Sequence, residues 1–270
     1  MAKLFDSYTR VVPTWLAAAR HLNQQLPGRT AENLFLEITD PLTITTEDRQ
    51  LMGKVDGALI HSELTLRTVA GTIFPLALYK RYGRPGFYTK YMEMLERGKQ
   101  VGTWGTYAAR MIDRAGQDSE ARINPLEMLV TKLRNQPLKK NGKESSYVST
   151  YELGVAEPKD DLSMEEWGAE LPTYDPAFDA LRWFGGPCLS HLSFKRIPAG
   201  TGHAVNLVAI YRSHHYCARA LGNLIGLAQL QSFVAKEAGL KVGTLSCLSS
   251  YAELDVGMWG GVNAVNQVLA

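Results

Sequence analysis

Cysteine is scarce in this chain of 270 residues, which contains only Cys188, Cys217 and Cys247. An odd number of cysteines, with no CxxC pair and no Cys/His spacing typical of zinc ligands, argues against a disulfide framework and a structural metal site. We therefore expect reduced thiols and no bound metal. The open question is whether one cysteine is a nucleophile, because most free cysteines only pack in the core.

Strong net charge and long apolar runs are also lacking. The 29 Lys and Arg residues against 27 Asp and Glu residues give a formal net charge of +2, so no strong overall field attracts nucleic acid or an anionic membrane. The first residues contain no apolar signal core, and no stretch has the apolar length of a membrane span. We expect a cytoplasmic protein without membrane or nucleic-acid partners.

The patterning predicts an α+β fold, with a mixed β-sheet covered by helices. Hydrophobic residues make up 45% of the chain, and no repeat or linker divides it, so we predict a single domain over residues 1–270. A polar, acidic stretch over residues 157–177 predicts an exposed loop or insertion. Helices are expected over residues 14–26, 57–83 with a bend near Pro75, 86–98, 106–116, 125–136 and 223–239, and at the end of the chain, whereas strands are expected over residues 33–41, 145–153, 188–197, 203–213 and 240–250.

Several motifs follow one another in the region from Gly102 to Asp255. They are GTYAARM with Tyr107, INPLEMLVTKLRNQPLKK with Lys139 and Lys140, GPCLSHLSF with Cys188, and YRSHHYCARALGN with Arg212, Ser213 and Asn223. In this order they resemble the nucleotide-binding core of the thymidylate synthase superfamily, which includes the pyrimidine nucleotide hydroxymethylases. Each match is weak by itself, and the order makes the resemblance more specific. The first hundred residues match only loosely.

The resemblance implies a thymidylate synthase-like homodimer, joined through its sheet, that transfers a one-carbon unit from methylene-tetrahydrofolate to C5 of a pyrimidine nucleoside monophosphate. It implies that Cys188 adds to C6 of the base, since a thiolate is a strong nucleophile near neutral pH. Tyr107 matches the family's active-site tyrosine. Glu63 is the candidate for the proton-relay glutamate, one position out of register. The alternative for Cys188 is a buried thiol that fills space.

Three residues are expected to bind the nucleotide directly. Arg212 offers a planar fork of donors for a phosphate, and Ser213 adds a hydroxyl. Asn223 can donate and accept at once, which suits N3 and O4 of uracil, so we expect a uridine nucleotide as substrate. The alternatives are a structural ion pair for Arg212 and a helix cap for Asn223.

Further phosphate contacts are implied by the resemblance alone. Arg29 is the candidate for the family's N-terminal phosphate arginine. In the family, two arginines at this place bind the partner subunit's phosphate. Lys139 and Lys140 keep the positive charge but lack the planar guanidinium that can form two parallel hydrogen bonds with a phosphate. A solvated lysine turn is the alternative.

The chain departs from the family at the sugar and folate ends of the site. His215 replaces an aspartate that contacts the pterin, and Glu253 and Asp255 replace a sugar-binding His and Tyr. The sequence ends within about fifteen residues of Asp255, without the family's closing tail, which favours hydroxymethyl over methyl transfer because reduction requires the exclusion of water. Two readings stay open. His215 and Glu253 bind a different sugar or cofactor, or the chain is a nucleotide-binding protein without turnover.

Overall fold

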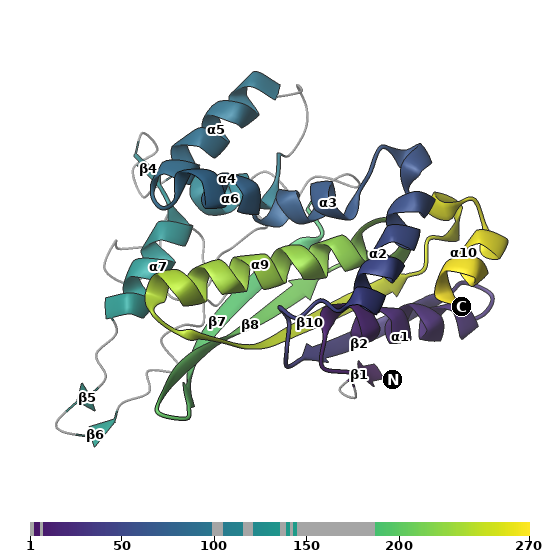
Figure 1. Cartoon of the computed structure of the whole chain (residues 1–270), viewed down its shortest axis with the longest axis horizontal. Helices are drawn as coiled ribbons and strands as arrows, with labels where there is room; N and C mark the ends of the chain where they lie inside the picture. The colour runs from purple at the N-terminus through teal and green to yellow at the C-terminus, as the bar shows by residue number, and fades with distance from the viewer. Residues whose placement is uncertain are drawn as a thin grey trace. The chain divides into compact units, whose positions relative to one another are not determined.

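The computed structural model describes residues 3–5, 8–98, 105–115, 121–135, 139–140, 143–144 and 187–270 (Figure 1). The strand expected over residues 145–153 and the loop expected over residues 157–177 lie outside these ranges. The chain forms two compact units, each assembled from separate stretches of sequence. The first unit comprises Met1–Phe74, Val208–Leu230 and Gly243–Ala270, and the second comprises Pro75–Leu207 and Gln231–Val242.

The elements within the described ranges are as follows. The helices are α1 (Val11–Gln24), α2 (Thr46–Ala58), α3 (Leu66–Ile73), α4 (Leu76–Tyr82), α5 (Gly86–Gly98), α6 (Tyr107–Ile112), α7 (Pro125–Asn135), α9 (Leu221–Ala238) and α10 (Val262–Leu269), with short turns η1 (Ile60–Ser62), η3 (Tyr216–Ala220, a π-helix) and η4 (Val256–Trp259). The strands are β1 (Lys3–Phe5), β2 (Thr30–Ile38), β3 (Arg114–Ala115), β4 (Arg122–Ile123), β5 (Lys139–Lys140), β6 (Lys143–Glu144), β7 (Leu189–Ala199), β8 (Gly202–Tyr211), β9 (His214–His215) and β10 (Lys241–Glu253). In the described part of the chain, no helix combines the length and apolar character that crossing a bilayer requires.

The main sheet is mixed and open. In the first unit its strands follow the order β1-β2-β10-β8, and β9 pairs with β10. Strand β1 is parallel to β2, whereas β10 is antiparallel to β2. In the second unit β7 lies beside β8. Helices pack against this sheet, so the predicted α+β class with a mixed sheet is confirmed.

The register between β2 and β10 gives the first unit's sheet two distinct faces, because successive side chains of a strand point to opposite sides. One face is fully buried, and α1 packs on β2. The other face is half-buried and partly apolar. The buried pairs are Leu245–Ile38, Cys247–Leu36 and Ser249–Leu34, and the half-buried pairs are Leu248–Phe35 and Ser246–Glu37.

Several predicted helix boundaries are wrong because caps and prolines set them. Helix α1 begins at Val11 instead of residue 14, since Pro13 fits the first turn, where its missing N–H is not needed. The sequence predicts helix only from residue 57, so it misses α2, which begins at Thr46. A capping box opens it, in which Thr45 and Asp48 each accept a hydrogen bond from the other's backbone N–H.

The helix predicted over residues 57–83 is divided into η1, α3 and α4. A second capping box, between Thr65 and Thr68, starts α3. The chain leaves helical geometry at Phe74 and Pro75, where the bend is predicted, because proline cannot donate to the preceding turn. Helix α6 stops at Ile112 rather than residue 116, since Asp113 is extended and leads into β3.

Helix α9 approaches α3 closely within the first unit. A Cβ placed on Gly222 would lie 2.6 Å from the Cβ of Val69, and one on Gly226 would lie 2.8 Å from the carbonyl oxygen of Ala70. Contacts below 3 Å do not occur between real Cβ atoms and their neighbours. The two glycines therefore let the helices pack backbone to backbone.

The second unit has an aromatic core of its own. Tyr79 of α4 packs edge-on against Phe233 of α9, with ring centroids 4.8 Å apart, and Phe87 of α5 contacts both rings. Arg84 forms ion pairs with Glu127 and Glu237 at the edge of this cluster. These contacts join α4, α5, α7 and the end of α9.

Candidate functional site

Tyr107 and Cys188, two of the predicted catalytic residues, contact each other in the second unit. The phenolic oxygen of Tyr107 accepts hydrogen bonds from the backbone N–H of Cys188 at 3.0 Å and of Leu189 at 3.2 Å. Tyr107 is the first residue of α6, whose N-cap Thr106 accepts a hydrogen bond from the N–H of Ala109. The contact joins the start of β7 to a motif 81 residues earlier in the chain.

The three thiols differ in exposure and in acidity. Cys188 is half-buried, whereas Cys217 and Cys247 are 2% and 0% exposed. Burial raises the pKa of Cys247 to about 12, and burial, together with the nearby Asp255 carboxylate, raises the pKa of Cys217. A protonated thiol is a poor nucleophile. Cys217 and Cys247 therefore pack in the core, and Cys188 is the most accessible of the three thiols.

Arg212 and Ser213 form the link between β8 and β9 in the first unit. The hydroxyl of Ser250 on β10 donates to the carbonyl oxygens of Tyr211 at 3.2 Å and Arg212 at 3.0 Å. This contact holds the backbone of the link. Arg212 is exposed and Ser213 is half-buried, so both side chains extend from a fixed backbone.

Asn223 is buried inside α9, two residues after the helix begins. The helix-cap alternative is therefore wrong. Its amide nitrogen Nδ2 lies 3.2 Å from Nε2 of His214, and Nδ1 of His214 lies 3.0 Å from the hydroxyl of Ser249. The ring of Tyr211 stacks on the imidazole, with centroids 4.0 Å apart and planes 3° apart. Burial lowers the pKa of His214 to about 3, so this imidazole is neutral near pH 7.

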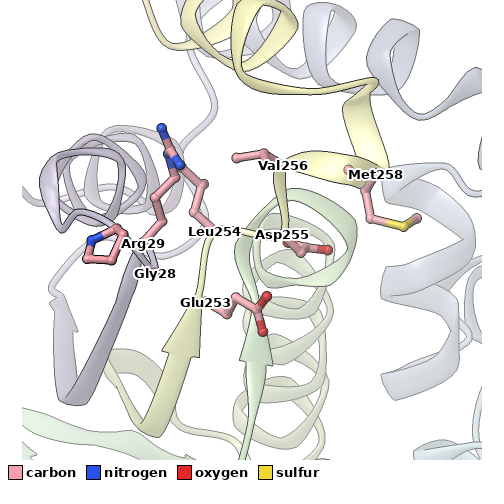
Figure 2. Close-up of a pocket in the computed structure, with 9 residues that line it drawn as sticks. Gly28, Arg29, Glu253, Leu254, Asp255, Val256 and Met258 are labelled. Carbon is pink, nitrogen blue, oxygen red and sulfur yellow. The ribbon is translucent and has the colours of Figure 1, made fainter.

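A pocket of about 420 Å³ brings together two predicted binding residues of the first unit, Arg29 and Glu253 (Figure 2). The N–H of Leu254 donates to the carbonyl of Arg29 at 3.0 Å and joins the two walls. Figure 2 shows the guanidinium of Arg29 pointing away from the Glu253 carboxylate; its Nε donates to Asn23. The pocket is lined by Pro27, Gly28, Arg29, Glu253, Leu254, Asp255, Val256, Gly257 and Met258.

His215 stands beside the acidic side chains of this pocket. Parallel pairing of β9 with β10 places His215 opposite Glu253, and its Nδ1 lies 3.9 Å from Glu253 Oε2 and 4.0 Å from Asp255 Oδ2. The side chains of His215 and Glu253 are 43% and 38% exposed, whereas that of Asp255 is 13% exposed. His215 and Glu253 are therefore accessible to a ligand.

Asp255 has a structural partner that the sequence motif does not predict. Its carboxylate accepts hydrogen bonds from the backbone N–H of Cys217 at 2.7 Å and of Ala218 at 3.3 Å. These two groups open η3, which continues into α9, so the negative charge lies at the positive end of a long helix. Burial raises the pKa of this carboxyl group.

The remaining predicted residues take no part in these contacts, or their side chains lie outside the described residues. Glu63 follows η1 on the surface, with a left-handed backbone at φ 58°. Lys139 and Lys140 form β5, in which Lys139 pairs with Glu144 of β6; their side chains lie outside the described residues. Within the described ranges, no group of three or more His, Cys, Asp or Glu side chains is placed to hold a metal ion.

His214 and Ser249 are polar residues that the motifs do not assign to the site. The sequence could have indicated Ser249. It continues the alternation of Leu245 and Cys247, so its hydroxyl is expected on the buried face of the strand. A buried polar side chain in such a position needs a hydrogen-bond partner.

Compared with models of known protein families and with curated proteins, the chain matches none of them.

Proposed function

We propose that this protein is a thymidylate synthase-like transferase that adds a one-carbon unit to C5 of a pyrimidine nucleoside monophosphate. The observation that carries the proposal is the pair of hydrogen bonds from the backbone of Cys188 and Leu189 to Tyr107. It joins two motifs that the sequence resemblance assigns to one active site. Cys188 is also the half-buried thiol among three cysteines whose other members are enclosed.

The proposed chemistry starts with the Cys188 thiolate. It adds to C6 of the base, and the electron pair of the C5–C6 double bond moves onto C5 and O4. C5 then forms a bond to the one-carbon unit and loses its hydrogen as a proton. The bond between the one-carbon unit and its donor would break, with its electron pair leaving on the donor, and water would add to the one-carbon unit to give the hydroxymethyl product that the sequence favours. The Cys188 thiolate is expelled as the C5–C6 double bond reforms. Methylene-tetrahydrofolate would supply the one-carbon unit as an electrophile. Glu63 is the proposed proton carrier.

The nucleotide is assigned to the polar residues around β8, β9 and α9. Arg212 and Ser213 would bind the phosphate, with Arg29 and the partner subunit's Lys139 and Lys140 as further cations. Asn223 would read the base. The backbone of Arg212, held by the Ser250 hydroxyl at the link between β8 and β9, supports the phosphate role.

The pocket beside Glu253 is assigned to the sugar or the pterin. Its volume of about 420 Å³ lies in the range of small-molecule sites, about 300–1,000 Å³. The carboxylate of Glu253 is an acceptor for O–H or N–H groups, which both a sugar and a pterin carry, and His215 lies on the same side. These residues fit a donor-rich ligand better than an anionic one.

A binding protein without turnover is the second candidate, and Asp255 favours it. This residue occupies the place of a sugar-binding tyrosine in the motif, yet its carboxylate is engaged by two backbone N–H groups of η3. It therefore has less capacity left for a ligand. In this alternative the nucleotide binds and no bond is made.

Dimerisation through the sheet is part of the proposal. The face of the first unit's sheet opposite α1 carries half-buried apolar side chains, among them Phe35, Leu248 and Val208. A second copy would cover them. A Leu248→Arg variant should then sediment as a monomer under conditions where the wild type is a dimer. Lys54→Glu, at an exposed position of α2 outside the sheet, is the control for a charge change and should stay a dimer. A wild type that is monomeric at micromolar concentration contradicts this part.

The test of catalysis is exchange of the C5 hydrogen with tritiated water, because exchange needs only the cysteine adduct. The protein is incubated with dUMP, UMP, dCMP and CMP in turn. The wild type and a Cys217→Ala control should exchange at least one nucleotide, whereas Cys188→Ser should exchange none. Nucleotide binding without exchange by the wild type favours the second candidate, and no binding at all contradicts both.

A further inference from the structure

A chain of three buried polar side chains connects β10, β9 and α9 in the first unit. Ser249, His214 and Asn223 are 0%, 1% and 5% exposed, and His214 contacts both of the others. A buried polar group without a partner costs about 1–3 kcal/mol. The three side chains therefore hold one another in a defined arrangement.

The tautomer of the His214 imidazole and the orientation of the Asn223 amide are linked through one hydrogen bond. A neutral histidine has one donor nitrogen and one acceptor nitrogen. Nε2 faces the amide nitrogen of Asn223, which can only donate, so Nε2 is the acceptor. Nδ1 therefore carries the hydrogen and donates to the Ser249 hydroxyl.

Two aromatic rings fix the plane of the His214 imidazole. Tyr211 stacks on one side, and Tyr216 packs edge-on with its centroid 5.5 Å away. Turning the ring would break both contacts and both hydrogen bonds. The position of Nε2 is therefore set by the core and does not depend on a ligand.

With Nδ1 protonated, the imidazole and the amide of Asn223 hold each other in one arrangement. One hydrogen of Nδ2 is directed at His214, and the second hydrogen and the oxygen Oδ1 remain for another partner. No donor in the described part of the chain contacts Oδ1. A flipped amide would put Oδ1 against the Nε2 lone pair, so the flip requires His214 to move its hydrogen from Nδ1 to Nε2.

We infer that His214 is the positioning residue that holds the Asn223 amide and thereby sets a preference for uracil over cytosine. This inference rests on the proposed function, in which Asn223 reads the base. Uracil offers the N3 hydrogen to Oδ1 and the O4 oxygen to Nδ2. Cytosine offers the opposite pattern and requires the flipped amide.

The first test measures the affinities of UMP and CMP by calorimetry, together with those of the deoxynucleotides. The wild type should prefer the uridine nucleotide roughly ten- to a hundredfold, as one unsatisfied buried group would produce. His214→Phe keeps the stacked ring and removes the acceptor, and it should reduce the preference to near unity. His214→Gln restores an acceptor and should recover part of it. The matched control is His191→Phe. His191 is a half-buried histidine that does not belong to the group formed by Ser249, His214 and Asn223, and its variant should keep the full preference.

The second test uses the wild-type protein without a nucleotide, so it does not depend on whether a His214 variant folds. Nitrogen-15 NMR of histidine-labelled wild type should show His214 in the Nδ1–H form, with an unprotonated Nε2. The Nε2–H form overturns the inference, because the amide of Asn223 would then be reversed. An unchanged uracil preference in His214→Phe also overturns it. If the wild type binds no pyrimidine nucleotide, the proposed function and the base preference both fail, and the NMR result alone decides whether His214 holds the amide.

Discussion

The phenolic oxygen of Tyr107 accepts the backbone N–H of Cys188 at 3.0 Å, and the same oxygen accepts the N–H of Leu189. One side-chain atom therefore fixes the backbone of Cys188 and of Leu189, the first residue of β7. Because both amides lie at the start of β7, this contact positions the backbone from which the Cys188 thiol extends. Tyr107 thus has a structural role that can be measured separately from catalysis.

Tyr107→Phe should lower the free energy of unfolding by about 1–3 kcal/mol, since two backbone N–H groups lose their acceptor. It should also slow C5 exchange, because the thiol loses its fixed backbone. Urea unfolding followed by circular dichroism measures the first effect. Tyr82→Phe is the control, since Tyr82 is 40% exposed in the same unit, and it should unfold like the wild type. Equal stability of the Tyr107 and Tyr82 variants would contradict the prediction.

The cysteines should differ in reactivity in the order of their exposure. Iodoacetamide at pH 8 should modify Cys188 in the folded protein and leave Cys217 and Cys247 unmodified, because burial raises the pKa values of the last two thiols. Mass spectrometry of digested protein assigns the labelled sites. In denaturant all three should react, which controls for reagent access. Faster labelling of Cys247 than of Cys188 in the folded state would show that the exposure order is wrong.

The strands and long helices follow from local patterning, and most of them were predictable. Alternation in β10 predicts both its existence and its buried face, because Leu245 and Cys247 share one phase. The helix boundaries that the patterning fails to predict are those set by a few capping residues. Helix α2 has no continuous apolar stripe, and its start depends on the Thr45–Asp48 capping box, a signal of two residues within a polar stretch.

The site residues were harder to place from the sequence, because their partners come from distant elements. The motifs predict that Tyr107 and Cys188 share an active site; the structure places the two residues in contact, and their catalytic roles stay a prediction. No local pattern indicates that Asp255 accepts bonds from η3, or that His214 lies between Ser249 and Asn223. Those contacts depend on the register of β9 against β10, which is a tertiary property.

The glycines of α9 should respond to alanine in the opposite way from a glycine of α2. Gly226→Ala should destabilise the protein by about 1–3 kcal/mol, because its Cβ would lie 2.8 Å from the carbonyl oxygen of Ala70. Gly53→Ala, in α2 with nothing within 4 Å, should stabilise it by about 0.5–1 kcal/mol through helix propensity. Thermal unfolding of both variants is the measurement. A stabilising Gly226→Ala would mean that α3 and α9 do not pack closely.

Acid should destabilise the protein partly through His214. Its pKa is about 3 in the folded chain, and an unfolded histidine has a pKa of about 6.5. Between these values the unfolded chain binds a proton that the folded chain does not, so the free energy of unfolding falls as the pH decreases from about 6.5 toward 3, and above this window the contribution is constant. The slope due to one proton is about 1.4 kcal/mol per pH unit. His214→Phe should remove this slope from urea-unfolding measurements between pH 6 and pH 4, whereas His61→Gln, at an exposed position, should keep it. If the His214 variant has the same pH dependence as the wild type, the imidazole is not held neutral by burial.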